Sequence, residues 1–301
     1  MNKHSLLITI ASLIIASSLV ATDFVMISDL GSSARSIALG NVDGYNTAAD
    51  AVFSNPAALT NTSTYSVSLF SSKLMNDVHY FNAAISAKTA YGTFAAGIYE
   101  QAVTGIASTS RINHQIAQTG SYAYKNTQMK LSYQTDLSST VSVAATYTHY
   151  TVAVANYSGA GSNIDAGILA SFNSFKLSVL AQNIVPNQSV SFSHGNKEQL
   201  PFSLSSTAII SFKNITLLPQ IKLSKNNILF SQGISYTPSF LTQVTLHAGY
   251  KQKLDYLSQK HANLSLGASL NLLDLNIHVA YERSDYILMD HNMYASFSYG
   301  I

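Results

Sequence analysis

The last eleven residues of the chain, His291 to Ile301, constrain its fold more than any other stretch. Apolar side chains occupy one parity and mostly polar ones the other: Met293, Ala295, Phe297, Tyr299 and Ile301 against Asn292, Tyr294, Ser296, Ser298 and Gly300. Because successive side chains of a strand point to opposite faces, this run predicts a strand with one apolar and one polar face. A strand of about ten residues that alternates to the end of the chain is typical of the closing strand of an outer-membrane β-barrel. A strand of a soluble β-sandwich alternates in the same way, so this run alone leaves both folds open.

The composition favours the membrane fold. Of 301 residues, 47% are hydrophobic and only 10% are Asp, Glu, Lys or Arg, whereas soluble domains carry about 25% charged residues. Charged side chains are costly on a lipid-facing surface, so their scarcity indicates a membrane protein. Beyond the N-terminal stretch the chain has no apolar run of the roughly 20 residues that a membrane helix needs. We therefore expect an all-β fold, a closed transmembrane antiparallel β-barrel, since open sheet edges would leave backbone groups unpaired in hydrocarbon.

Charge and cysteine content exclude several kinds of site. The formal net charge is only +2, and the Lys and Arg residues do not cluster, so no nucleic-acid surface is expected. The chain has no Cys, which excludes a disulfide framework, thiol catalysis and lipid attachment at an N-terminal Cys.

The first 21 residues have the pattern of a secretory signal peptide. Lys3 and His4 form a short basic start, Leu6 to Val20 is an apolar core, and Ala21 precedes a more polar stretch. We therefore predict that residues 1–21 direct export and that the mature protein lies in the outer membrane of a Gram-negative-type bacterium.

The next stretch, residues 22–61, does not alternate. The run from Ser32 to Gly40 is expected to make a short helical turn with a Ser cap and a closing Gly, and Pro56 is placed to begin a helical turn after an extended Asn55. The apolar side chains of this stretch favour an N-terminal plug packed inside the barrel over a loose periplasmic tail. We assign residues 22–61 to this plug and residues 62–301 to the transmembrane barrel.

Parity counting from Thr62 onward predicts about fourteen strands, with a bulge near Asn126 where the apolar parity changes. Tight turns are expected at 88–90, 137–139, 173–174, 213–214, 238–239 and 273–274, and mostly longer loops on the other side, including 104–118, 156–162 and 186–199. Short turns on one side and longer loops on the other are typical of outer-membrane barrels. Several tyrosines at strand ends, such as Tyr150 and Tyr236, are candidates for the interfacial belts of such barrels, although Tyr is also an ordinary strand former.

The parity opposite to the apolar one is mostly small and polar, with few charges. Asp165, His247, His278 and Glu282 are the candidate lumen-facing polar residues. His247, His278 and Glu282 are weighed as a metal or acid–base site, but they come from non-adjacent strands, which favours hydrogen-bonded lumen groups without metal or cofactor. No Ser, Thr or His is marked as a nucleophile by its local sequence, so we do not expect an enzyme; a lipid-hydrolysing activity ranks third among the function hypotheses.

Two motifs in the N-terminal stretch carry a family resemblance. Ser33-Ala34-Arg35-Ser36-Ile37-Ala38-Leu39-Gly40, followed by Asp50 and Asn55-Pro56-Ala57-Ala58, resembles the start of the FadL-like outer-membrane barrels. Asp165-Ala166-Gly167, Gln182-Asn183 and Leu200-Pro201 are similar to the PorV/PorQ branch of that superfamily. The resemblance implies a fourteen-stranded barrel with an N-terminal plug, and it assigns plug or gating roles to Arg35, Gly40, Asn55, Pro56 and Ala57.

Two functions follow as expectations from this resemblance. The first is transport of small hydrophobic molecules across the outer membrane; the alternative is a PorV/PorQ-like structural role in protein secretion or cell-surface attachment. The expected partners are outer-membrane lipid, the barrel-assembly machinery through the C-terminal strand, and either a hydrophobic ligand or secretion components.

Overall fold

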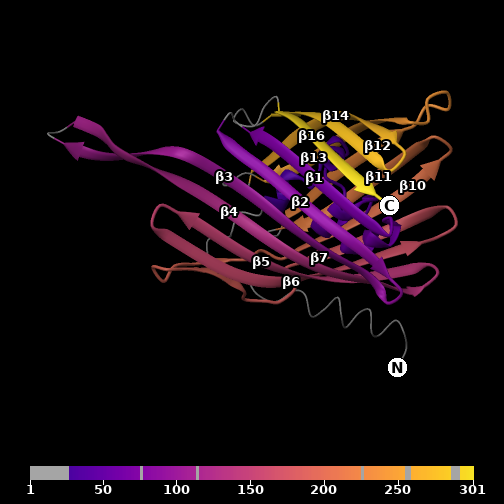
Figure 1. The fold of residues 1–301 in the computed structure, drawn as a ribbon, viewed down its shortest axis with the longest axis horizontal. Coiled ribbons are helices and arrows are strands. Elements are labelled where there is room, and N and C mark those ends of the chain that lie inside the picture. The colour runs from indigo at the N-terminus through magenta and orange to yellow at the C-terminus, as the bar shows by residue number, and fades with distance from the viewer. Residues whose placement is uncertain (1–26, 75–76, 113–114, 225–226, 255–258, 286–291) are drawn as a thin grey trace.

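The chain folds mainly into β-strands in a computed structural model, which describes residues 27–301 except 75–76, 113–114, 225–226, 255–258 and 286–291 (Figure 1). The predicted signal peptide, residues 1–21, lies outside the described residues. Among the described residues, no helix is long and apolar enough to cross a membrane.

Fourteen antiparallel strands form the wall of a closed barrel, which confirms the predicted fold and strand number. The first seven are Tyr65–Leu74 (β1), Val78–Thr89 (β2), Gly92–Ile112 (β3), Gln115–Ser138 (β4), Val141–Val154 (β5), Tyr157–Ser171 (β6) and Phe175–Gln182 (β7). The others are Ser203–Phe212 (β10), Ile215–Ser224 (β11), Asn227–Tyr236 (β12), Val244–Leu254 (β13), Lys260–Leu272 (β14), Leu275–Ser284 (β15) and Asn292–Gly300 (β16). Two short strands, Ser189–Phe192 (β8) and Lys197–Gln199 (β9), lie in the connection between β7 and β10.

The barrel closes where its first and last strands meet. β1 pairs with β16 from Ser66 opposite Gly300 to Ser71 opposite Ala295. Two backbone bonds of 2.9 Å between Tyr65 and Ile301 extend this pairing to the last residue. The described part of the C-terminal run is therefore the closing strand that its alternation predicted.

The two faces of the wall differ as the alternation requires. In β16 the burial alternates along the strand, with Met293 77% and Phe297 50% exposed while Ser296 is buried. Outward-facing Leu131, Leu266 and other large apolar side chains form an exposed apolar surface around the barrel. The inward face carries mostly Ser, Thr, Asn and Gln, most of them buried.

The predicted bulge near Asn126 is wrong. Pairing is continuous there, with Asn126 opposite Gln101 on one side and Val152 on the other. The apolar parity changes because the Tyr124 side chain points inward and packs against Tyr150 and Val152, not because the strand slips. The register shifts of β3 and β4 lie elsewhere, at Val103/Ile106, Ser108/Thr109 and Asp136/Ser138.

Two of the predicted loops are also wrong, because they are strands. Residues 106–112 of β3 pair with residues 115–122 of β4, so a hairpin extends past the neighbouring strands in place of the loop 104–118 (Figure 1). The expected loop 156–162 is part of β6, and only Ala155 and Asn156 connect it to β5. These segments are rich in Ser, Thr, Gly and Gln and have few large apolar side chains, so backbone pairing forms them without the apolar alternation used to find strands. On the other side, five of the six tight turns are confirmed, whereas the connection at 238–239 is longer and spans residues 237–243.

The N-terminal segment, here residues 27–62, lies inside the ring of strands. It contains three 3₁₀ helices, Ile27–Leu30 (η1), Ala49–Phe53 (η2) and Pro56–Asn61 (η3), and the α-helix Ala34–Ala38 (α2). α2 contacts β13 to β16, η2 contacts β1 to β4, and η3 contacts β3 to β6. Side chains of the segment also bond Ser178 of β7 and Ser205 of β10, and the backbone N–H of Asp43 donates to Gln220 of β11.

Three glycines on adjacent strands of the wall allow the segment to approach closely. A methyl group on Gly249 of β13 would stand 2.3 Å from the Gly40 nitrogen, and one on Gly267 of β14 would stand 2.6 Å from the Ala38 side chain. On β12, Gly233 faces the Leu39 carbonyl in the same way, at 2.8 Å. Any larger residue would push the backbone of residues 38–40 off the wall, so these glycines form a socket for the end of α2.

We predict that Gly249→Ala loosens this socket. The added methyl meets backbone, which cannot move cheaply, so we expect a loss of about 1–3 kcal/mol, typical of overpacking. Trypsin cleavage after Arg35 should become faster, and the thermal midpoint of the barrel should fall. Gly120→Ala is the matched control, since nothing lies within 4 Å of its added methyl; equal cleavage rates in the two variants would contradict the socket.

Candidate functional site

The predicted helix around Arg35 is present and has both predicted caps. The Ser33 hydroxyl accepts a bond from the Ser36 N–H at 3.2 Å. Gly40 has a φ of 71°, and at the other end Gly40 N–H donates to Ile37 and Asn41 N–H to Ser36, the arrangement of a Schellman cap. The sequence S-A-R-S-I-A-L-G therefore folds into one short turn of helix, and the end of this helix packs against the three wall glycines.

Arg35 links helix α2 to the part of the N-terminal segment that contains Tyr45 and Thr47. Its guanidinium donates to the Thr47 hydroxyl at 3.0 Å and lies 4.5 Å from the centre of the Tyr45 ring. Asp50 lies nearby, where burial raises the pKa of its carboxyl against the opposing effect of bonds from Ser33 and Asn46. The cavity left between this cluster and the wall measures only about 10 Å³, room for about one water molecule.

Asn55 fixes the other end of the segment to the wall. Its fully buried amide donates to the Ile168 carbonyl, the Ser178 hydroxyl and the Val179 carbonyl at 2.8–3.1 Å. Its oxygen accepts from the Ala57 N–H at 3.0 Å, so the same side chain caps η3, which begins at Pro56. Gly167 makes room for this amide, because a methyl group there would overlap the Asn55 oxygen.

Two of the predicted lumen residues, His247 and His278, meet through a serine on the strand between them. The Ser269 hydroxyl lies 2.6 Å from Nε2 of His247 and 2.6 Å from Nδ1 of His278. The other His247 nitrogen bonds Ser235 at 2.8 Å. Each imidazole therefore has a hydroxyl partner, and His278 also borders the small cavity beside Arg35.

Glu282 belongs to a different cluster of the lumen. It forms an ion pair with Lys251 at 2.8 Å and accepts a bond from the Tyr294 hydroxyl at 3.0 Å. Both charged side chains are buried. The structure thus does not bring Glu282 together with the two histidines, and among the described residues no group of three or more His, Cys, Asp or Glu could hold a metal ion.

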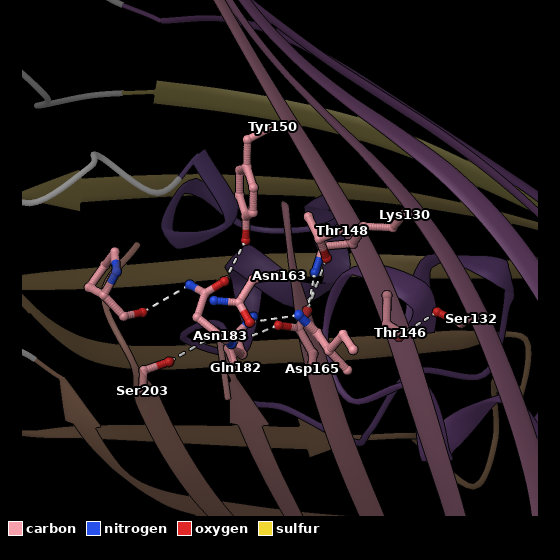
Figure 2. A network of polar contacts seen from close by, with 12 residues as sticks. Lys130, Ser132, Thr146, Thr148, Tyr150, Asn163, Asp165, Gln182, Asn183 and Ser203 are labelled. Atoms are coloured by element: carbon pink, nitrogen blue, oxygen red, sulfur yellow. Dashed lines mark hydrogen bonds and ion pairs between the residues drawn. The ribbon is translucent and has the colours of Figure 1, made fainter. Parts of the chain in front are cut away.

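Asp165 is the centre of a buried network on β4, β5 and β6 (Figure 2). Its carboxylate pairs with Lys130 at 2.7 Å and accepts bonds from the Thr148 hydroxyl and the Asn183 N–H. Lys130 and Asp165 are only 1% and 2% exposed. A buried pair of this kind is stable only when both partners are present and hydrogen-bonded, because either charge alone is costly in the interior.

Asn183 links this network to the connection between β7 and β10. The residue has a φ of 55° at the point where the chain leaves the wall. Its side chain accepts from the Tyr150 hydroxyl at 2.8 Å and donates to the Pro201 carbonyl at 2.9 Å. One residue therefore joins both ends of the loop 183–201 to the wall; Figure 2 shows its contact with Tyr150.

The same loop covers an apolar cluster on the inner face of the wall. Val190 and Leu200 of the loop pack with Tyr150 and Val152 of β5 and with Tyr124 of β4. Tyr150 is thus fully buried in the lumen, which makes its assignment to an interfacial belt wrong. Its hydroxyl donates to the side chain of Asn183, which is 33 residues further along the chain. Only the three-dimensional arrangement therefore identifies its role.

We predict that Asp165→Asn destabilises the barrel strongly. It leaves the Lys130 ammonium buried without a counter-charge, which costs about 3–5 kcal/mol in the free energy of unfolding. Replacing both residues, as Lys130→Met with Asp165→Leu, should recover most of that loss. The comparison is urea unfolding in detergent micelles, with Glu100→Gln as control because it breaks the half-exposed pair with Lys125 and should cost under about 1 kcal/mol. Equal losses at the two pairs would contradict a structural role for the buried one.

The fold is that of known outer-membrane channels. The chain resembles the Pseudomonas putida toluene transporter TodX, with a TM-score of 0.63 and 14% identity, covering 93% of this chain and 99% of that one. It also resembles the Ralstonia pickettii toluene transporter TbuX, with a TM-score of 0.62, 12% identity and coverage of 89% and 97%. A FadL homologue from Pseudomonas aeruginosa gives a TM-score of 0.59, 11% identity and coverage of 94% and 99%.

Neither of the sequence comparisons adds to this. No protein-family model matches the chain, and no curated protein matches it. At these identities the likeness concerns the fold alone: this chain has the barrel fold of the FadL-type hydrocarbon channels.

Proposed function

We propose that this protein is an outer-membrane barrel through which small hydrophobic molecules cross, with its N-terminal segment acting as the plug. The observation that carries the proposal is the fit between the segment and the wall. Wall glycines receive residues 38–40, and Asn55 is bonded to β6 and β7. A segment held this specifically inside a barrel serves to control the lumen.

The outer surface supports placement in a membrane. Large apolar side chains such as Leu131, Leu266 and Phe297 are exposed on the outward face of the strands, where a soluble protein would carry charges. Strands of about ten residues are long enough to span the hydrocarbon layer. In this proposal residues 1–21 direct export, and the C-terminal strand β16 is the part that the barrel-assembly machinery recognises.

The comparisons favour transport over the alternative. The solved structures described above are of hydrocarbon transporters and of a FadL homologue, which supports a channel rather than an enzyme. No observation favours the PorV/PorQ-like role in secretion. Small hydrophobic molecules are thus the proposed substrate class.

We predict that the double variant Asn55→Ala/Pro56→Ala opens the plug. Asn55 makes four hydrogen bonds, and those to Ser178 and Ala57 are buried; each buried partner left unpaired costs about 1–3 kcal/mol. The unseated population should therefore rise at least tenfold. Uptake of radiolabelled toluene by proteoliposomes should increase, as should the sensitivity of expressing cells to apolar antibiotics.

The exposed Asn156, at the turn between β5 and β6, provides the control Asn156→Ala. That variant should match the wild type in both assays. Unchanged permeability of the double variant, with the barrel still folded, would count against a gating plug. Toluene flux no faster than through protein-free vesicles, in every variant, would count against transport.

A further inference from the structure

A shallow groove lies on the outer face of the wall, over β3 to β6 and β8. Its volume is about 710 Å³. The lining residues Ile98, Met129 and Ala160 lie on the outward parity of their strands, the same parity as the exposed Phe94 and Leu131. The groove therefore faces the surroundings of the barrel and not its lumen, and it is separate from the plug.

The groove combines an apolar floor with a polar border. Ile98, Met129 and Ala160 provide apolar surface, while Ser158, Ser191 and other hydroxyl-bearing residues lie along it. Lys125 and Glu100 also line it and form an ion pair of 2.7 Å. This is the arrangement of an amphiphile site, with hydrocarbon on one part and a charged or hydrogen-bonding group on the other.

The position of Lys125 along its strand places the ammonium near the lipid head groups, at one border of the apolar band. Phe94 and Tyr133 contact each other on the outward face near the turn end of β3 and β4, with their rings tilted by 42° and their centres 5.0 Å apart. Aromatic pairs of this kind mark a membrane interface. Lys125 is eight residues beyond Tyr133 on β4 (133 − 125 = 8), or about 20 Å along the membrane normal for a strand tilted by about 40°. Since the apolar band of such barrels is about 25 Å tall, Lys125 lies close to its opposite border.

We propose that this groove binds an anionic, phosphate-bearing membrane lipid, with an acyl chain on the apolar floor and the phosphate at Lys125. The proposal rests on the membrane placement given above and not on transport. Lys125 can serve both partners, because an ammonium has three donors and its side chain is 52% exposed beside Glu100. Continuity with the lipid-facing wall favours a lipid over a soluble protein as the occupant.

Native mass spectrometry of the full-length protein, titrated with phosphatidylglycerol in a neutral detergent, tests this site. Lys125→Gln should weaken the binding of the first lipid about fivefold, the effect of one cation near a lipid phosphate. Glu100→Gln should strengthen it, because it removes the carboxylate that competes for Lys125. Ala160→Trp should reduce binding by filling the groove, and phosphatidylcholine should bind more weakly than phosphatidylglycerol.

Lys260→Gln is the matched control, since Lys260 lies on β14, outside the groove, and bonds the Ile228 carbonyl. It should leave phosphatidylglycerol binding unchanged. Equal loss in Lys260→Gln and Lys125→Gln, or wild-type binding in both Lys125→Gln and Ala160→Trp, would overturn the site. Those results would leave transport untouched, whereas failure of the wild-type protein to insert into lipid vesicles would instead overturn the membrane placement.

Discussion

The pairing of β1 with β16 is the interaction on which the rest of the structure depends. A sheet in hydrocarbon cannot leave an edge open, because each unpaired backbone group there costs several kcal/mol. The bonds between Tyr65 and Ile301, at the two ends of the barrel sequence, remove both edges at once. Closure also creates an inside and an outside, and this division lets one side of each strand be apolar and the other polar.

The lumen is then filled by the N-terminal segment, whose short helix packs against glycines of the barrel wall. A helix of five residues is far too short to be stable alone in water. Its caps satisfy its ends, and the glycines of β12, β13 and β14 allow its backbone to lie against the wall. The polar groups that such contact buries are paired with one another, as in the Asn55 bonds and in the Lys130–Asp165 network. A short sequence motif thus becomes a defined element only through tertiary contacts.

The sequence was sufficient to predict what depends on apolar alternation and on turn or cap chemistry. The strand number, the closing strand and the helix from Ser33 to Gly40 all follow from such local signals. It was insufficient where strands have few large apolar side chains, as in the projecting hairpin of β3 and β4. It also missed the roles of Tyr150 and Asn183, because their bonds join residues distant in sequence. Asp165 was identified as a polar residue of the lumen, but nothing in the sequence paired it with Lys130.

The enclosed position of the N-terminal segment has a consequence for how the barrel is made. The segment precedes β1 in the chain, yet it touches strands as late as β16 through the bond from Ala34 to Ser296. Once the seam between the first and last strands has formed, a chain segment can enter only through an open mouth. During assembly, residues 27–62 therefore either enter the partly formed barrel before β1 pairs with β16, or pass afterwards through one open end of a lumen that side chains already fill.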